Sequence, residues 1–144
     1  MKKKYKLTEE SIIFKDKTLY RIEAIKDFEF IHKGNKGGYV ESENNLSHNG
    51  NCWIYNNAKV YNKALVSDNA KVYDNAEIYD NAIIWNNVLI NDNVKIHGNA
   101  IIYNNTIICD NVEIEGNTAI RGRLIIKDNA KIFSNKDYIV FKNW

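Results

Sequence analysis

Residues 67–88, SDNAKVYDNAEIYDNAIIWNNV, decide the fold, because asparagine returns at every sixth position of this stretch. A small or branched apolar residue follows each of these asparagines. A period of six matches neither the 3.6-residue turn of an α-helix nor the two-residue alternation of a simple strand. The stretch therefore belongs to a repeat whose unit is six residues long.

The repeat extends in both directions without a change of register. Isoleucine or valine occupies fourteen consecutive positions at a spacing of six, from Ile54 to Ile132. A small or branched residue precedes each of them by two positions, and asparagine precedes that residue everywhere except at Lys63 and Arg123. The regularity predicts one continuous solenoid with no insertion inside it.

Each unit is predicted to be a short strand followed by a corner. In residues 58–61, alternation sends Ala58 and Val60 to one face and Lys59 and Tyr61 to the other. The Asp-Asn or Asn-Asn pair then turns the corner, because asparagine and glycine tolerate positive φ better than other residues. On this interpretation the asparagine column marks the corners. Lys63 and Arg123 would be strained corners or corners of another turn type.

The outward residues predict the number of sides. Outward residues that are 18 positions apart form two columns that are either charged or apolar throughout. Spacings of 12 or 24 place charged and apolar residues in the same column. One column alternates in charge, as expected for neighbouring strands, and another is entirely apolar. The charged column is Lys59, Glu77, Lys95, Glu113 and Lys131, and the apolar column is Leu65, Ile83, Ile101 and Ala119. Three strands per coil therefore predict an all-β, three-sided parallel β-helix of about five coils.

Three segments are expected along the chain. Residues 1–50 form an N-terminal β cap and lead-in, with a hairpin that turns at Asp16 and Lys17. Residues 51–135 form the hexapeptide-repeat β-helix, which needs a cap because its end strands are otherwise unpaired. Residues 136–144 form a last strand or a second cap, built from Tyr138, Ile139, Val140, Phe141 and Trp144.

The bulk composition restricts the partners. The 144 residues carry 20 basic and 18 acidic side chains, a net charge of +2 that predicts neither a nucleic-acid nor a membrane partner. No apolar run has the length of a membrane span or follows the N-terminal lysines as in a signal peptide. The two cysteines are far apart and suit a reducing compartment, so the expected location is the cytoplasm.

The repeat resembles that of the hexapeptide-repeat superfamily, and this resemblance implies a left-handed β-helix. The superfamily includes acyltransferases, γ-class carbonic anhydrases and non-catalytic proteins. The run KYKLTEE…TLYRIEAIKDF…KGNKGGYVESENNLSHNGNCWIYNNAKVY also resembles the start of uncharacterised, YdcK-like hexapeptide-repeat proteins of phages, prophages and bacteria. Members of that group often continue beyond a segment like KDYIVFKNW, so the resemblance leaves open a further C-terminal module.

An acyltransferase is one function that the resemblance implies, with a catalytic histidine at the boundary between trimer subunits and acetyl-CoA as the only cofactor. His97 points outward and Glu115 lies one coil later, close enough to orient the imidazole. These two residues are the candidate catalytic pair. The interpretation that we favour is that His97 replaces a tyrosine in the ladder begun by Tyr61 and Tyr79.

The other histidines predict no site. His48 is expected in the cap, and His32 has no identifiable partner. Zinc in a carbonic anhydrase needs three protein ligands, and the three histidines have no matching spacing, so no metal site is predicted.

Large apolar residues on the outside of the helix are the main functional signal. Nothing in the packing of one coil requires them to face outward, and exposed apolar patches usually mark contacts. The predicted interface comprises Leu65, Ile83, Trp85, Ile101, Tyr103, Leu89, Ile107 and Ile125. The sequence thus favours a protein without catalytic activity that binds itself, as a trimer or dimer, or another protein. The alternatives are coverage of this surface by the termini, the acyltransferase, and a phage-encoded inhibitor of a bacterial defence complex such as CRISPR.

Overall fold

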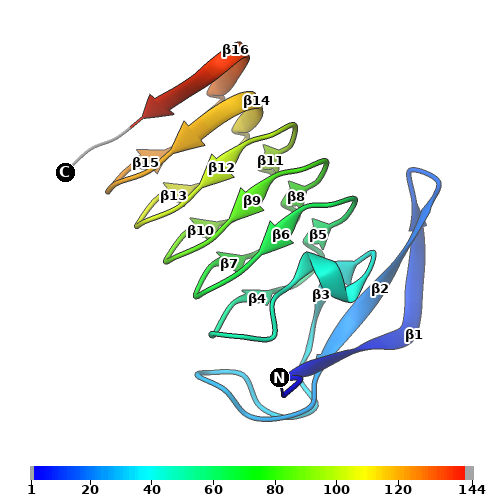
Figure 1. The fold of residues 1–144 in the computed structure, drawn as a ribbon. Coiled ribbons are helices and arrows are strands. Elements are labelled where there is room, and N and C mark those ends of the chain that lie inside the picture. The colour runs from blue at the N-terminus through cyan, green and yellow to red at the C-terminus, as the bar shows by residue number, and fades with distance from the viewer. Residues whose placement is uncertain (1, 142–144) are drawn as a thin grey trace.

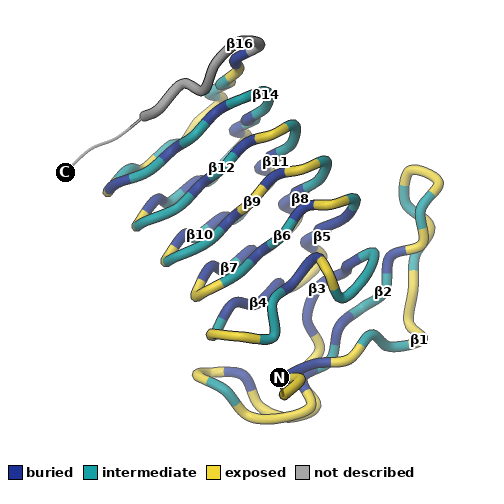
Figure 2. The backbone as a smooth tube through the Cα atoms, viewed as in Figure 1, coloured by how far each residue is buried: buried dark blue, intermediate teal, exposed yellow. Residues whose placement is uncertain are grey.

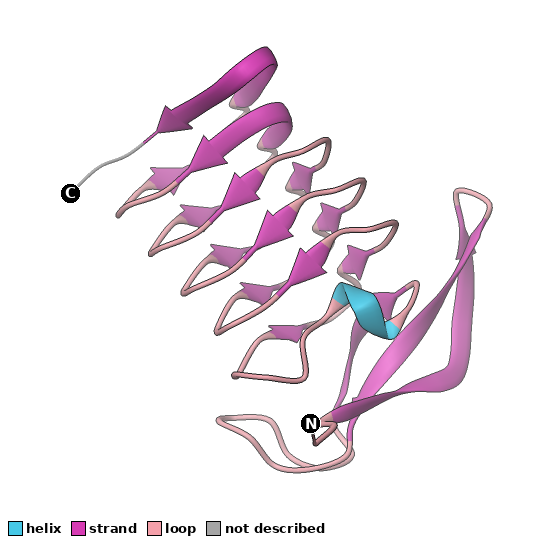
Figure 3. Ribbon diagram, in the orientation of Figure 1, coloured by secondary structure: helices cyan, strands magenta, loops and turns pink. Residues whose placement is uncertain are grey.

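The chain winds into a column of stacked coils with three sides, and a long hairpin stands beside its N-terminal end (Figure 1). The computed structural model describes the backbone of residues 2–141 and the side chains of residues 2–134. Short strands alternate with loops along each coil, and strands of successive coils pair in parallel (Figure 3). One side is a five-stranded ladder. The prediction of an all-β, three-sided parallel β-helix of about five coils is confirmed.

The three sides are named here by their outward residues. The charged side contains β5 (Lys59–Val60), β8 (Glu77–Ile78) and β11 (Lys95–Ile96), and the aliphatic side contains β6 (Leu65–Val66), β9 (Ile83–Ile84) and β12 (Ile101–Ile102). The third side contains β4 (Trp53–Ile54), β7 (Lys71–Val72), β10 (Leu89–Ile90), β13 (Ile107–Ile108) and β15 (Ile125–Ile126). The longer β14 (Glu113–Ile120) pairs with strands of both the charged and the aliphatic side.

The register between coils is 18 residues throughout the helix. On the charged side Lys59 pairs with Glu77, and the series continues through Lys95 and Glu113 to Lys131. On the aliphatic side Leu65 pairs with Ile83 and Ile83 with Ile101. Three strands per coil are therefore confirmed, and opposite charges face each other across neighbouring coils.

The inward columns form one continuous core. The isoleucine and valine column is fully buried from Ile54 to Ile120, while Ile126 and Ile132 in the last coil are partly buried. Buried residues recur along every coil between exposed ones (Figure 2). Each buried isoleucine or valine contributes about 1.5–3 kcal/mol before the entropy of ordering is subtracted.

The corners differ from the prediction by one residue. The left-handed residue is the one before the asparagine column, with φ of 55° at Asp68, 61° at Asp74 and 57° at Asp92. At the corners that contain Lys63 and Arg123, positive φ falls on Asn62 and Gly122 instead. The expectation of strained corners at Lys63 and Arg123 is therefore wrong. The full left-handed column is Gly50, Asn56, Asn62, Asp68, Asp74, Asp80, Asn86, Asp92, Gly98, Asn104, Asp110, Gly116, Gly122 and Asp128.

Side chains in this left-handed column also join the coils. The Asp92 carboxylate accepts a hydrogen bond of 2.9 Å from the Asp110 amide N–H, and Asp110 accepts one of 2.8 Å from Asp128. Among the residues whose side chains the structure describes, nine such bonds, each spanning 18 residues, run along the three corners. The asparagine column makes side-chain amide ladders beside them, with distances from 3.0 Å between Asn99 and Asn117 to 3.4 Å between Asn69 and Asn87. Aspartate and asparagine thus combine tolerance of positive φ with a hydrogen-bond acceptor.

A β-hairpin and a connecting strand cap the first coil. Strands β1 (Tyr5–Phe14) and β2 (Lys17–Ala24) are antiparallel, and β2 pairs with β3 (Lys36–Val40), which joins the charged side beside β5. The hairpin turns at Lys15 and Asp16, both at positive φ, one residue earlier than predicted. A single 3₁₀ turn, η1 (Glu43–Asn45), leads into the repeat.

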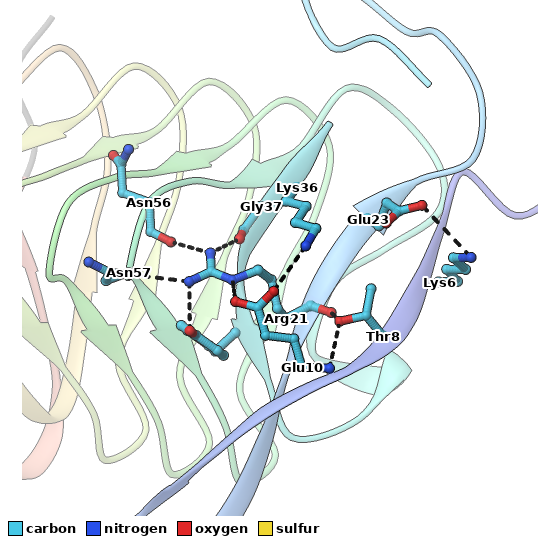
Figure 4. Close-up of polar contacts among 10 residues, drawn as sticks. Lys6, Thr8, Glu10, Arg21, Glu23, Lys36, Gly37, Asn56 and Asn57 are labelled. Atoms are coloured by element: carbon cyan, nitrogen blue, oxygen red, sulfur yellow. Dashed lines mark hydrogen bonds and ion pairs between the residues drawn. The ribbon is translucent and has the colours of Figure 1, made fainter. Parts of the chain in front are cut away.

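Arg21 ties the cap to the helix. Its guanidinium donates to the Gly37 carbonyl at 2.6 Å, to the Asn56 carbonyl at 3.1 Å and to the Tyr39 hydroxyl at 2.6 Å (Figure 4). It also pairs with the Glu10 carboxylate at 2.7 Å. One side chain therefore links both strands of the hairpin to β3 and to the first corner of the repeat.

The far end of the described chain is one more strand. Strand β16 (Lys131–Phe141) pairs in parallel with β14, at an offset of 18 residues where Lys131 lies opposite Glu113 and, after a register shift between Gly116 and Thr118, at an offset of 21 where Phe141 lies opposite Ile120. Strand β16 includes residues 138–141, for which the sequence predicts a last strand or a second cap, and Trp144 lies outside the described residues. Within the described chain, no helix has the length and apolarity needed to span a membrane.

Substitutions at one corner test which residue makes the turn. Replacing Asp92 by alanine should lower the free energy of unfolding by about 2–3 kcal/mol, because a hydrogen bond is lost and alanine disfavours the left-handed conformation. Asn93→Ala should cost less than about 1 kcal/mol, since only an exposed amide ladder is lost. Urea denaturation measures both, and a larger loss for Asn93→Ala would contradict this assignment. Asp92→Gly should fall between them, because glycine retains the backbone conformation.

Candidate functional site

His97 lies on the charged side, next to the corner that leads to the aliphatic side. Its ring stacks on Tyr79 with 4.6 Å between centroids and 2° between planes, and Tyr79 stacks on Tyr61 at 5.1 Å. The side chain is only 14% exposed. The imidazole therefore continues the tyrosine ladder and is held parallel to it.

Three carboxylates surround this imidazole. Its Nε2 lies 2.9 Å from Glu113 Oε2 and 3.3 Å from Glu115 Oε2, while its Nδ1 lies 3.6 Å from Asp80 Oδ2. The structure thus places Glu115 beside His97, and it adds the closer Glu113 and the more distant Asp80. The sequence could have predicted Glu113 as a further neighbour of His97. Alternate residues of a strand point to the same face, so Glu113 lies on the same face as Glu115, next to it on that strand.

Carboxylates outnumber cationic groups in the immediate surroundings of the imidazole. Among the ion pairs of the described residues, His97 is the partner of Asp80, Glu113 and Glu115, and none of the three pairs with a lysine or arginine within 4.0 Å. The hydrogen bond from His97 lowers the pKa of Glu113, against the opposing effect of burial. Both ring nitrogens face carboxylates, so the arrangement is suited to hold positive charge.

An open polar groove lies along the adjoining corner. Its volume is about 860 Å³, and Asp80 and Gly98 line it beside His97. Lys17 of the hairpin and Lys63 lie at the same groove. A small polar ligand there would meet both signs of charge.

The predicted interface residues lie on the aliphatic and third sides. Ile83 is 38% exposed in the middle of the aliphatic side, and Ile125 is 66% exposed on the third side. Trp85 stacks on Tyr103 with 5.1 Å between ring centroids. Leu65, Ile101, Leu89 and Ile107 are partly exposed.

The N-terminal segments cover other parts of the helix. Phe14 of the hairpin packs edge-on against Tyr61, and Phe28 packs against Trp53 at the start of the third side. Glu29 pairs with Lys71 at 2.9 Å. The described part of the cap therefore protects the ends of the charged and third sides, and leaves apolar surface open at Ile83 and Ile125.

The remaining histidines and cysteines lie away from His97. His48 stacks on Tyr5 in the cap, and its Nδ1 accepts a hydrogen bond from the Lys4 amide. Cys52 is buried under the cap, where the Lys4 ammonium lies 3.3 Å from its sulfur. Cys109 is partly exposed, and its pKa is raised by desolvation and by the neighbouring Asp110.

The six-residue repeat and the three-sided parallel β-helix into which it winds are similar to those of the hexapeptide-repeat superfamily. No family model matches the sequence. Over 66 residues the chain is 36% identical to a protein of Escherichia coli (strain K12) described as the uncharacterised acetyltransferase YdcK. That match covers 40% of this chain and 20% of YdcK.

The coupling between Glu113 and His97 predicts a pH dependence of stability. Because the pKa of Glu113 is lowered in the folded chain from a usual value of 4.5, its carboxylate stabilises the fold above that pH. This stabilisation should be lost as the pH falls through the lowered pKa. The difference in free energy of unfolding between wild type and Glu113→Gln should therefore shrink between about pH 5 and pH 3.

Urea denaturation at a series of pH values measures this difference. The same pair of proteins carrying His97→Gln is the matched control, since the hydrogen bond that shifts Glu113 is then absent. Equal pH dependence in both backgrounds would contradict the assigned cause.

Proposed function

We propose that this protein is a β-helix that self-associates through two adjacent apolar sides to form a trimer. The observation that carries the proposal is the position of these sides. The aliphatic and third sides share the corner formed by Asp68, Asn86, Asn104 and Gly122, and each has an isoleucine whose surface is open. The charged side lies opposite that corner and is continuous with the hairpin.

A closed ring of three-sided helices requires this arrangement. Around a threefold axis, each subunit directs one corner inward and uses the two flanking sides to contact its neighbours, while the remaining side faces solvent. The aliphatic side of one copy then meets the third side of the next. The charged side, with its lysines and glutamates, remains hydrated.

The apolar residues supply the free energy for such contacts. Burial of apolar surface is worth about 25 cal/mol per Å². Trp85 and Tyr103 lie on the aliphatic side near the shared corner, and aromatic residues are enriched in interfaces. The loop that contacts Trp53 and Lys71 occupies the start of the third side, so the contact would use Leu89, Ile107 and Ile125 in later coils.

Light scattering on a sizing column tests this proposal. The wild-type chain of 16.7 kDa should elute with three times that mass. Ile83→Asp with Ile101→Asp should give a monomer with an unchanged circular dichroism spectrum, because a buried carboxylate opposes association. Leu89→Asp with Ile107→Asp should do the same, since the two sides contact each other.

Ile13→Asp is the matched control. Ile13 is 82% exposed on the hairpin, so its replacement should leave the trimer intact. A monomeric wild type would overturn self-association. A dimer insensitive to substitutions on the third side would overturn the threefold arrangement alone.

A second candidate function is acyl transfer from acetyl-CoA. It is supported by the description of YdcK as an acetyltransferase and by the position of His97 next to the aliphatic side. In the trimer this position is the outer mouth of the cleft between subunits. His97 would take the proton of an acceptor hydroxyl or amine, and Glu115 would orient the imidazole.

Calorimetry with acetyl-CoA separates the two candidates. An acyltransferase should give a heat of binding at concentrations up to about 1 mM, the upper end of usual Michaelis constants. Binding should also weaken in the Ile83→Asp, Ile101→Asp protein, because the cleft needs two subunits. No detectable heat for the assembled wild type would count against acyl transfer and leave self-association unaffected.

A further inference from the structure

We propose that His97, Glu113 and Glu115 form a binding site for a divalent cation of the zinc type on the charged side. One ring nitrogen and one oxygen from each carboxylate lie within 4.8 Å of one another. The site is built within one chain, so it depends on neither self-association nor acyl transfer.

The separations of these atoms suit metal coordination. The histidine Nε2 lies 2.9 Å from Glu113 Oε2 and 3.3 Å from Glu115 Oε2. A zinc ion about 2.0–2.2 Å from each of its tetrahedral ligands keeps the ligand atoms roughly 3.3–3.6 Å apart. A cation could therefore replace the hydrogen bond between His97 and Glu113 after small outward movements of the side chains alone.

The backbone holds the three ligands in place. Glu113 and Glu115 are alternate outward residues of β14, and His97 follows β11, the strand that pairs with β14. The His97 amide donates to the Ile114 carbonyl at 2.9 Å, and its ring lies flat on Tyr79. Ligands on paired strands are positioned more firmly than ligands on loops.

Asp80 provides an independent observation. Histidines that bind metals usually donate their other ring N–H to a carboxylate, which orients the ring. Asp80 Oδ2 lies 3.6 Å from His97 Nδ1, the ring nitrogen that does not face the two glutamates, so a small movement would bring it within hydrogen-bond distance. The same Asp80 oxygen accepts a hydrogen bond of 3.0 Å from the Gly98 amide, so the carboxylate is fixed there.

The excess of carboxylates at the ligands also favours a cation. Three carboxylates face one imidazole, and among the described residues no lysine or arginine lies within 4.0 Å of them, although Lys95 and Lys131 flank Glu113 on the neighbouring strands. A divalent ion would neutralise two of these charges. One nitrogen and two carboxylate oxygens suit zinc or manganese better than calcium, which prefers six to eight oxygens.

A second cluster, Asp92, Cys109 and Asp110, is a natural comparison. It lacks an imidazole, and burial raises the pKa of the Cys109 thiol, which disfavours the thiolate that a metal needs. Asp92 and Asp110 each already accept a backbone N–H of the next coil. This cluster therefore serves as the control site.

Calorimetric titration of the metal-free, untagged protein with zinc at pH 7.5 tests the proposal. The expected result is one cation per chain. His97→Gln and Glu115→Gln should each weaken binding at least tenfold, Asp80→Asn should weaken it about tenfold, and Cys109→Ser should leave it unchanged. Calcium should bind more weakly than zinc.

A structural readout identifies the ligand set. Zinc should shift the ring resonances of His97 in NMR spectra of the wild type, while those of His32 remain in place. Absence of binding would overturn the proposal. Equal binding by wild type and His97→Gln, or a loss of binding with Cys109→Ser alone, would also overturn it, because the cation would then lie elsewhere.

Discussion

The left-handed residue at every sixth position is the constraint on which the structure depends. Where this residue is aspartate or asparagine, its side chain also accepts an amide hydrogen from the next coil, as Asp92 does from Asp110, and the corner is then both bent and bonded to the next one. Three such corners close a coil in 18 residues. That length places residues of one kind above one another and creates a charged side and an aliphatic side. The surface chemistry of the protein is thus a consequence of corner geometry.

Most of this architecture could be predicted from the sequence, because a strict period exposes the register directly. The error at the corners arose because two adjacent columns are both rich in turn-forming residues. The corners at Lys63 and Arg123 distinguish the two columns, because the second column lacks asparagine there. Where asparagine is missing, Asn62 and Gly122 still permit positive φ, and so the essential residue is the first of the pair. The regular columns show which residues share a side of the helix. The positions that break a column show which of the two turn residues must adopt positive φ.

The site was only partly predictable. The register brings Glu115 to His97, but the closer contact with Glu113 depends on how two long side chains turn across neighbouring strands. The role of Arg21 was not predicted either. Its partners lie 11 to 36 residues away in the sequence, outside any period, and they meet only when the hairpin folds against the first coil. The six-residue period therefore predicts contacts inside the helix and does not predict those of its cap.

The difference between the six-residue unit and the 18-residue coil governs how such a protein can change length during evolution. Duplication of 18 residues adds a coil and leaves every outward column on its own side. Duplication of six residues keeps every inward isoleucine in the core, so the chain still folds. All outward residues beyond the insertion then move round by one side, and the lysine and glutamate column continues on what was the aliphatic side. Selection on folding alone would accept both events, whereas selection on the surfaces would accept only whole coils.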